Sequence, residues 1–121
     1  MLTITLKGKE LTLAANLRVA YELQSFHNHK SYMDIFSEMD SMKLEEQVDI
    51  VFLAAKNGKN DEFPYDKKSF LDAYLDENNA SGLMNTIEKI MYGILGKTPE
   101  ELKAMQESME ASEENKGIEG N

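Results

Sequence analysis

Two histidines, His27 and His29, are separated by a single residue. They are the side chains of this sequence best suited to metal or proton chemistry. A metal site needs a third ligand that is held rigidly nearby, and the sequence around the pair does not supply one. We therefore expect the two histidines to lie in a solvated loop rather than to bind a metal.

Adjacent acidic residues are the second candidate, since paired carboxylates can act as general acids and bases or bind calcium. Catalytic carboxylates normally lie in apolar surroundings that shift their pKa values, and a calcium loop has a characteristic alternation that this sequence lacks. These pairs instead fall at helix starts, in loops and near the end of the chain, so we interpret them as solvated charges. They are Glu45-Glu46, Asp61-Glu62, Asp76-Glu77 and Glu113-Glu114.

Sequence motifs for a nucleophile or a bound cofactor do not occur. The G-x-S-x-G elbow, the Gly-rich phosphate loop and a G-x-G-x-x-G after a strand are all missing. The chain has no cysteine, which excludes disulfides, thiol nucleophiles and thiolate metal ligands and suits a reducing compartment. The sequence thus predicts a protein that is not an enzyme and that needs no cofactor.

Methionine is the residue type that suggests binding, because eight occur among 121 residues. Its flexible thioether side chain adapts to varied apolar partners, although it also fills small cores. A core position is the simpler interpretation of Met33, Met84 and Met91. Met105 and Met109 lie in a segment too polar for an internal helix, so we expect that narrow stripe to dock against another surface.

The element expected first along the chain is a β-hairpin over residues 1–14. Apolar and polar residues alternate on both sides of a Lys7-Gly8-Lys9 turn, in which the glycine can take a positive φ. A two-stranded hairpin is marginal by itself in water. Its apolar face must therefore pack on the helices or pair with another chain.

About five or six short amphipathic helices are expected after the hairpin, because apolar residues recur at intervals of three and four. The predicted helix starts are Asn16, Ser31, Ser41, Asp66, Ser81 and Thr98, and the predicted stops are His27, Asn57-Gly58, Asp76 to Asn79 and Gly96. The fold class is thus mostly α (α+β), with a single helical domain over 1–110 and a disordered acidic tail over 111–121.

The bulk properties narrow the classes of partner. A net charge of −9 disfavours direct binding to nucleic acid or to an anionic membrane surface. No apolar run approaches the ~20 residues of a membrane-spanning helix, and no secretion signal is visible at the N-terminus. The expected location is the cytoplasm.

The run from Leu2 to Leu13, LTITLKGKELTL, places two short strands around a G-K-E turn and leads into NLRVAYELQ, from Asn16 to Gln24. This opening resembles that of the tail assembly chaperones of long-tailed (siphovirus-type) phages and prophages of Gram-positive bacteria. The rest of the chain is similar in outline only, in its length, its acidity, its succession of short amphipathic helices and its charged C-terminal tail.

The resemblance implies a concrete function in the host cytoplasm. Such chaperones bind the long, helical, aggregation-prone tape-measure protein before tail-tube subunits assemble around it, and they leave before the tail is complete. A longer form made by translational frameshifting is implied to recruit the tail-tube protein, and the tail 111–121 would suit a flexible link to that extension. Many copies on one tape measure favour self-association. The expected contacts are Met84, Ile87, Met91 and Ile94, or Met105 and Met109 of the last helix.

Two other functions remain open from the sequence. An acidic inhibitor or decoy would occupy a basic protein surface. Against this, seven glutamates and two lysines between Glu100 and Asn121 account for five of the nine net negative charges, so the folded body is only moderately acidic. A structural virion component would differ from a chaperone by persisting in the finished particle.

Overall fold

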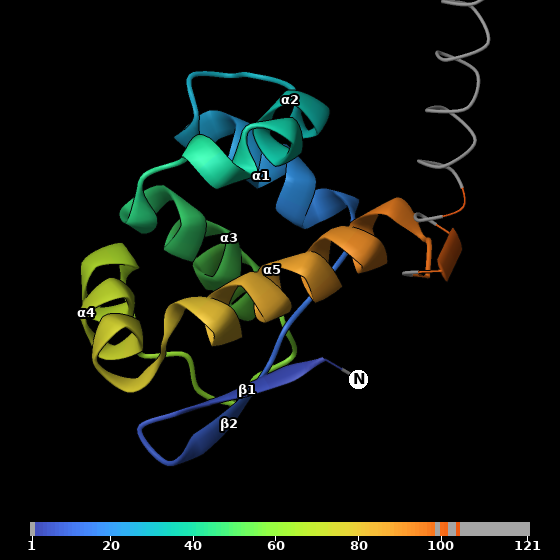
Figure 1. Cartoon of the computed structure of the whole chain (residues 1–121). Helices are drawn as coiled ribbons and strands as arrows, with labels where there is room; N and C mark the ends of the chain where they lie inside the picture. Colours follow the sequence, from blue (N-terminus) through green and yellow to red (C-terminus); the bar gives the residue numbers. More distant parts are fainter. Residues whose placement is uncertain (1, 99, 102–103, 105–121) are drawn as a thin grey trace, which may run out of the picture.

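The computed structural model describes residues 2–98, 100, 101 and 104, and it shows an N-terminal hairpin followed by five α-helices in this part of the chain (Figure 1). The elements are β1 (Thr3–Leu6), β2 (Lys9–Thr12), α1 (Leu17–Phe26), α2 (Tyr32–Ser37), the short 3-10 helix η1 (Met39–Ser41), α3 (Leu44–Lys56), α4 (Lys67–Glu77) and α5 (Ala80–Leu95). The predicted fold class is confirmed. The predicted disordered tail, 111–121, lies outside the described residues.

The hairpin has the register that its alternating sequence predicts. Ile4 pairs with Leu11 in antiparallel fashion, and Lys7 and Gly8 form the turn with φ of 50° and 76°. Positive φ at both central residues is the geometry of the two-residue turns that match the twist of a hairpin, and glycine adopts it without a Cβ clash. Opposite residues of an antiparallel pair point to the same face. Apolar side chains from both strands therefore gather on one side of the hairpin.

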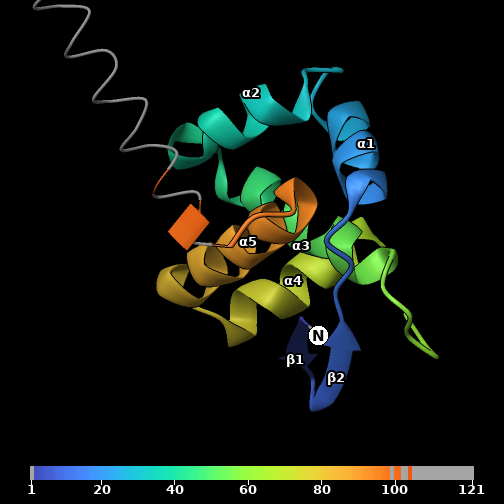
Figure 2. The same ribbon diagram turned by 90° about the vertical axis from the view of Figure 1, so that its right-hand side faces the viewer.

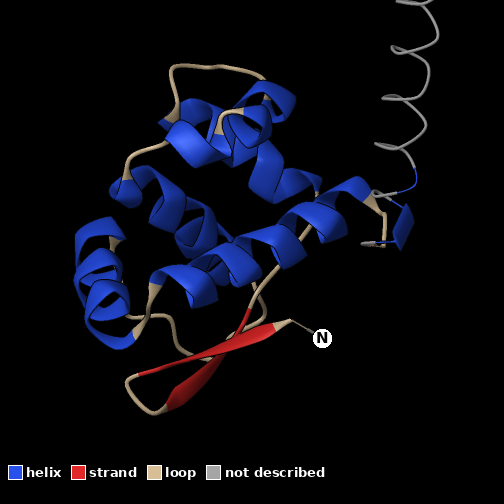
Figure 3. Cartoon of the chain, in the orientation of Figure 1, coloured by secondary structure: helices blue, strands red, loops and turns tan. Residues whose placement is uncertain are grey.

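That apolar face packs on helices of the same chain, which answers the question of where the hairpin docks. Leu6 is completely buried in the core, and the backbone N–H of Lys7 donates to both carboxylate oxygens of Glu77, at the end of α4 (3.1 and 3.0 Å). Figures 1 and 2 both show the hairpin below α4 and α5, and Figure 3 shows its two strands beside an otherwise helical body.

Helix α3 is the centre of the fold, since α1, α4 and α5 all pack against it. Eight consecutive residues of α3, Val48 to Ala55, are buried. A helix that is buried on all sides does not have the one-sided apolar pattern of a surface helix. One cluster of buried residues unites the hairpin with all five helices, so the described part of the chain has a single hydrophobic core.

An aromatic cluster fastens the loop between α3 and α4 to this core. Phe70 is completely buried, and four other rings have centroids 5.5 to 6.0 Å from its own. They are Phe52, Phe63, Tyr65 and Tyr74. Because Phe63 and Tyr65 belong to the loop, burial of Phe70 holds that segment in place.

Four predicted helix starts are confirmed by side-chain hydrogen bonds. Asn16 accepts from the N–H of Val19 and Ser31 accepts from that of Asp34. Asp66 forms a reciprocal capping box with Ser69 (2.8 and 2.9 Å), and Thr98 accepts from Glu101 (3.2 Å). Each contact spans three residues, which is why the local sequence was sufficient to predict it.

The other two predicted starts are wrong. Ser41 belongs to η1, where its hydroxyl donates to the carbonyl of Glu38 (2.9 Å), and α3 begins after Lys43 without a side-chain cap. Helix α5 begins before Ser81, because Asn79 lies two residues earlier and its side chain accepts from the N–H of Gly82 (2.8 Å). At α5 the hydrogen bond of Asn79 sets the boundary, whereas the start of α3 has no side-chain cap.

Candidate functional site

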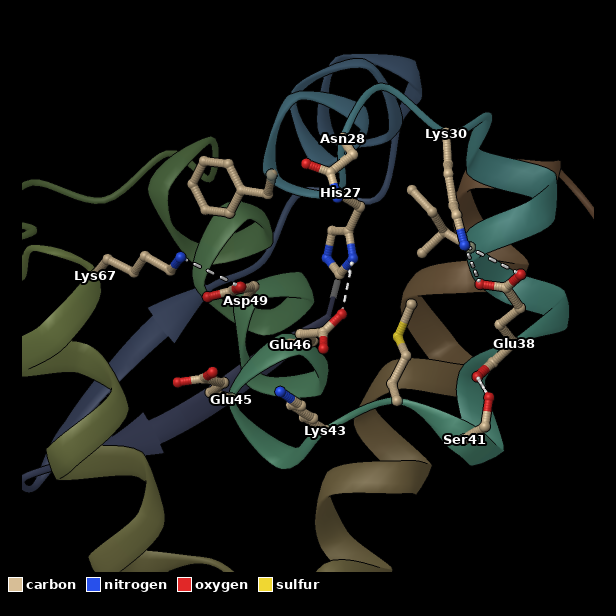
Figure 4. Close-up of a pocket in the computed structure, with 13 residues that line it drawn as sticks. His27, Asn28, Lys30, Glu38, Ser41, Lys43, Glu45, Glu46, Asp49 and Lys67 are labelled. Atoms are coloured by element: carbon tan, nitrogen blue, oxygen red, sulfur yellow. Dashed lines mark hydrogen bonds and ion pairs between the residues drawn. The ribbon is translucent and has the colours of Figure 1, made fainter.

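A polar cleft of about 420 Å³ opens where the C-terminal end of α1 meets the N-terminal ends of α3 and α4 (Figure 4). The loop before α2, together with α2 and η1, forms its opposite wall. The lining contains one histidine, three lysines and four carboxylates. Eight titratable groups therefore gather around this one cavity.

His27 is the most buried of these groups. It is the C-cap of α1, and the next two residues, Asn28 and His29, both have positive φ (56° and 60°), so the chain reverses sharply there. The reversal leaves the His27 side chain only 5% exposed, with Nδ1 lying 3.3 Å from Oε2 of Glu46. The predicted solvated position is therefore wrong for His27, whereas His29 is exposed as expected.

The second nitrogen of His27, Nε2, is buried and has no hydrogen-bond partner among the described residues. Buried polar atoms without a partner are uncommon in native proteins, and such an atom calls for an explanation. In Figure 4 the imidazole lies above Glu46, and the dashed line marks the contact between Nδ1 and the Glu46 carboxylate. Nε2 is thus a buried hydrogen-bonding atom behind the wall of the cleft, without a partner among the described residues.

Asp49 is the second buried charge, at 8% side-chain exposure, and it lies three residues after Glu46 on the same face of α3. Burial raises the pKa of the Asp49 carboxyl above its usual range. Lys67, whose Nζ is 3.6 Å from Oδ2, and His27 oppose that shift without cancelling it. The ion pair with Lys67 therefore offsets only part of the free-energy cost of burying the Asp49 carboxylate.

Two further pairs complete the cleft. Lys30 binds Glu38 across its outer wall at 3.0 and 3.3 Å, and this hydrogen bond raises the pKa of Lys30. At the opposite rim, the ammonium of Lys67 lies 4.8 Å from the centroid of the Phe26 ring, which is 38% exposed. This rim therefore combines the ring of Phe26 with the carboxylate of Asp49, and the ammonium of Lys67 already occupies the space beside them.

An apolar groove of about 160 Å³ lies between the start of α3, the end of α4 and the start of α5. Leu44 and Leu75 line it and remain 52% and 42% exposed, whereas Tyr74 and Leu83, which also line it, are buried. Large apolar side chains that stay exposed around a concave surface are typical of protein-binding sites. We call these four residues the leucine groove.

Other large apolar side chains are exposed without a groove. Leu17 and Tyr21 lie one turn apart on α1 and are 66% and 64% exposed, with the guanidinium of Arg18 stacked over the Tyr21 ring at 5.7 Å. Met33 is 52% exposed, so its predicted core position is wrong. Met39, by contrast, is buried in the core.

The structure places the predicted partner contacts of α5 mostly in the protein's own core. Ile87 is completely buried and Ile94 is 8% exposed, so neither is available to a partner in this conformation. Met84 and Met91 are partly buried and pack against the core from its margin. An apolar stripe at helical spacing looks the same whether it faces a core or a partner, so the sequence could not show that Ile87 and Ile94 are buried.

The remaining predicted contacts, Met105 and Met109, lie outside the described residues. Sequence reasoning also missed the leucine groove, because Leu44 and Leu75 follow the same spacing as buried neighbours. Asp49 did carry a signal, since it interrupts an apolar run, and a charge at such a position is expected to be buried and paired. Some of the groups that share the cleft with it, such as His27 and Lys67, come from segments far apart in sequence.

No group of three histidine, aspartate or glutamate side chains arranged to hold a metal ion occurs among the described residues. Within the same residues, every helix is too short or too polar to cross a lipid bilayer. No protein-family model matches this chain, and no curated protein or solved structure matches it either. The cleft and the groove are therefore the features of the described residues that bear on function.

Proposed function

We propose that this protein is a phage tail assembly chaperone that binds and solubilises the tape-measure protein during tail assembly. The observation that carries the proposal is the leucine groove, in which Leu44 and Leu75 remain about half exposed beside a buried apolar floor. A long helical partner with an apolar stripe presents side chains that would fill such a groove. Covering that stripe would keep the partner from aggregating.

The segment that resembles the tail chaperones supports the proposal in its local structure. It forms the expected hairpin and the expected helix α1, which begins at Asn16. The hairpin is held within its own chain by Leu6 and by the contact of Lys7 with Glu77. Its apolar face is therefore occupied, and the exposed apolar residues of the helices are the ones free to contact a partner.

The energy available from the groove can be estimated from the exposed fractions. Complete burial of a leucine side chain stabilises by roughly 2 kcal/mol, so burying the exposed half of each groove leucine contributes about 1 kcal/mol. Losing both contributions would lower affinity by about 30-fold, since 1.4 kcal/mol corresponds to a factor of ten.

The test is co-expression with the tape-measure protein encoded nearby, followed by size-exclusion chromatography of the soluble fraction. The wild-type chain should yield a soluble complex, whereas the tape measure alone should be insoluble. The double variant Leu44→Glu/Leu75→Gln should lose most of that complex. Glutamate suits the first turn of α3 electrostatically, and glutamine keeps helix propensity, so the fold should persist.

The matched control is Leu17→Glu/Tyr21→Gln, which removes an equally exposed apolar pair on α1. We expect it to retain the complex. If the wild-type chain leaves the tape measure insoluble, the proposed function is wrong. If the groove variant co-elutes as well as wild type, the function stands and the placement in the groove is wrong.

Self-association and a longer frameshifted form that recruits the tail-tube protein belong to the same proposal. Many copies on one tape measure would give a complex whose mass far exceeds a one-to-one assembly. Light scattering on the eluted complex measures that ratio. A complex that collapses when salt is raised, while groove substitutions have no effect, would instead favour an acidic inhibitor of a basic surface.

A further inference from the structure

The leucine groove has an acidic border on the side formed by α4 and α5. Apart from Leu44, every residue that lines the groove comes from the end of α4, the start of α5 or the junction between them. The stretch that supplies them, residues 71–87, contains three carboxylates and no lysine, arginine or histidine. The carboxylates are Asp72, Asp76 and Glu77. All charges that this stretch presents to a partner are therefore negative.

Two of these carboxylates lie beside Leu75 and are available to a partner. Residues three or four apart share one side of an α-helix, so Asp72 shares a face of α4 with both Leu75 and Asp76. Asp72 and Asp76 are exposed, and neither forms an ion pair with another described residue. Glu77 differs from them, because it accepts hydrogen bonds from the backbone N–H of Lys7 and so holds the hairpin.

The α3 side of the groove does not offset this negative charge. Lys43 directly precedes Leu44, but its side chain lines the polar cleft together with Glu45 and Glu46. Figure 4 shows Lys43 beside Glu45 in that cleft. The nearest base in the sequence therefore faces carboxylates of its own chain, and the acidic border of the groove keeps its attraction for cations.

The negative border discriminates among the possible occupants of the groove. A second copy of the chain carries a net charge of −9 and would be repelled. The chain's own segment from Glu100 to Asn121 would be repelled too, since it holds seven glutamates against two lysines. An amphipathic helix with basic residues beside its apolar stripe fits both features, because apolar side chains fill the groove while cations meet the carboxylates.

We propose that the leucine groove binds an amphipathic helical segment of a protein partner in which lysine or arginine residues flank the apolar stripe, and that Asp72 and Asp76 contact those cations. The inference rests on the proposed function, because it takes the groove as the site of partner binding and adds which kind of segment is bound. Exposed ion pairs contribute little individually. The two leucines therefore supply most of the affinity, and the two aspartates select between segments.

The test measures binding of three labelled helical peptides to the full chain by fluorescence anisotropy at low salt. All three have leucine at the same positions, three and four residues apart over about five helical turns. The other positions hold lysine in the basic peptide, glutamate in the acidic peptide, and equal numbers of both in the balanced peptide. The basic peptide should bind at least about tenfold more tightly than the acidic peptide. Added salt should reduce this difference, because exposed charges are screened.

A pair of charge variants then locates the selectivity. Asp72→Asn/Asp76→Asn removes both charges with little change of shape, and it should weaken binding of the basic peptide about three- to tenfold. The matched control, Asp34→Asn/Glu88→Gln, removes the same charge from exposed positions of α2 and α5. The control should bind the basic peptide within about twofold of wild type. Circular dichroism checks that both variants retain the fold.

An uncharged variant of the groove itself locates the apolar contact. Leu44→Gln/Leu75→Gln leaves the net charge unchanged and should weaken the basic and the balanced peptide to a similar extent. Peptide binding that ignores this variant would lie elsewhere on the protein and overturns the proposal. A wild-type chain that self-associates and becomes monomeric in this variant would assign the groove to a second copy, which overturns it as well.

The charge assignment has its own refuting results. Equal binding of the basic and acidic peptides overturns the proposal, and so does an Asp72→Asn/Asp76→Asn variant that loses no more affinity than the control. Displacement of the basic peptide by a peptide of residues 100–121 would assign the groove to the chain's own C-terminal segment and also overturns it. None of these assays contains the tape-measure protein, so their failure leaves the chaperone proposal to its own co-expression test.

Discussion

Replacing Asn60 with alanine is expected to loosen the hairpin from the end of α3. The Asn60 side chain accepts a hydrogen bond from the backbone N–H of Thr12 at 2.8 Å. Its Nδ2 donates to the carbonyls of Thr12 and Ala55, both at 3.0 Å. Asn60 thus pairs with the outer edge of β2 as a neighbouring strand would, and it ties that edge to the last turn of α3.

The size of the effect follows from these three partly buried bonds. An intramolecular hydrogen bond contributes about 1 kcal/mol net to stability. Loss of all three from Asn60→Ala should lower the free energy of unfolding by about 3 kcal/mol, or by about half of that if water reaches the freed groups. Both values are a large share of the roughly 5–15 kcal/mol that stabilises a typical domain.

Urea unfolding of the full chain, followed by circular dichroism, measures the change. The control is Asn85→Ala, on the exposed side of α5, which should be neutral or slightly stabilising because alanine has the higher helix propensity. Asn60→Asp keeps an acceptor for the N–H of Thr12 but has no donor for the two carbonyls. It should therefore cost at least as much as alanine.

A loss below about 0.5 kcal/mol for Asn60→Ala, which is the range of ordinary surface changes, would refute this reasoning. An Asn60→Asp variant as stable as wild type would do the same. In either case the hairpin would be held by its apolar face, through residues such as Leu6 and Leu11, and by the contact of Lys7 with Glu77.

Three further predictions concern the core and the cleft. Gly58→Ala should destabilise by about 1–3 kcal/mol in urea unfolding, because its Cβ would overlap the backbone of β2; Gly82→Ala, in the first turn of α5, should be neutral or stabilising by up to about 1 kcal/mol. Phe70→Ala should cost about 3–5 kcal/mol by the same measurement, since it empties the centre of the aromatic cluster, and a loss comparable to that of exposed Met33→Ala would contradict the packing. Asp49→Asn should stabilise the protein at neutral pH, because burial raises the pKa of Asp49 and so penalises its charged form in the folded state. That advantage should shrink as the pH falls toward about 4, where the wild-type carboxyl becomes protonated in both states; an advantage that grows on acidification would contradict the assigned direction.

The local elements of this protein could be predicted because their causes are short-ranged. The turn at Lys7-Gly8 needs two residues with positive φ, and the caps at Asn16 and Asp66 need an acceptor three residues before the amide that they bind. The helix start predicted at Ser81 was wrong because Asn79, two residues earlier, caps α5 instead. Element type therefore came out correctly while two helix boundaries did not.

The candidate sites were harder to predict, because exposure depends on neighbours that are distant in sequence. Ile87 and Leu75 both lie on apolar stripes at helical spacing, yet the first is buried against other helices and the second lines a groove. His27 was expected in solvent, but the reversal after α1 and the approach of Glu46 from α3 enclose it. The spacing of apolar residues along the chain shows which of them share a helix face, but it does not show what covers that face.

The sequence by itself therefore determined a hairpin followed by short helices, most of their caps, and a core large enough for one domain. Those features depend on backbone preferences and hydrogen bonds within about four residues, together with the overall share of apolar side chains. Only the tertiary structure decided that α3 would be buried all round, that Asp49 and His27 would share a cleft, and that Leu44 and Leu75 would remain exposed. These outcomes depend on how the helices pack, because burial and pKa are set by whatever lies across the interface.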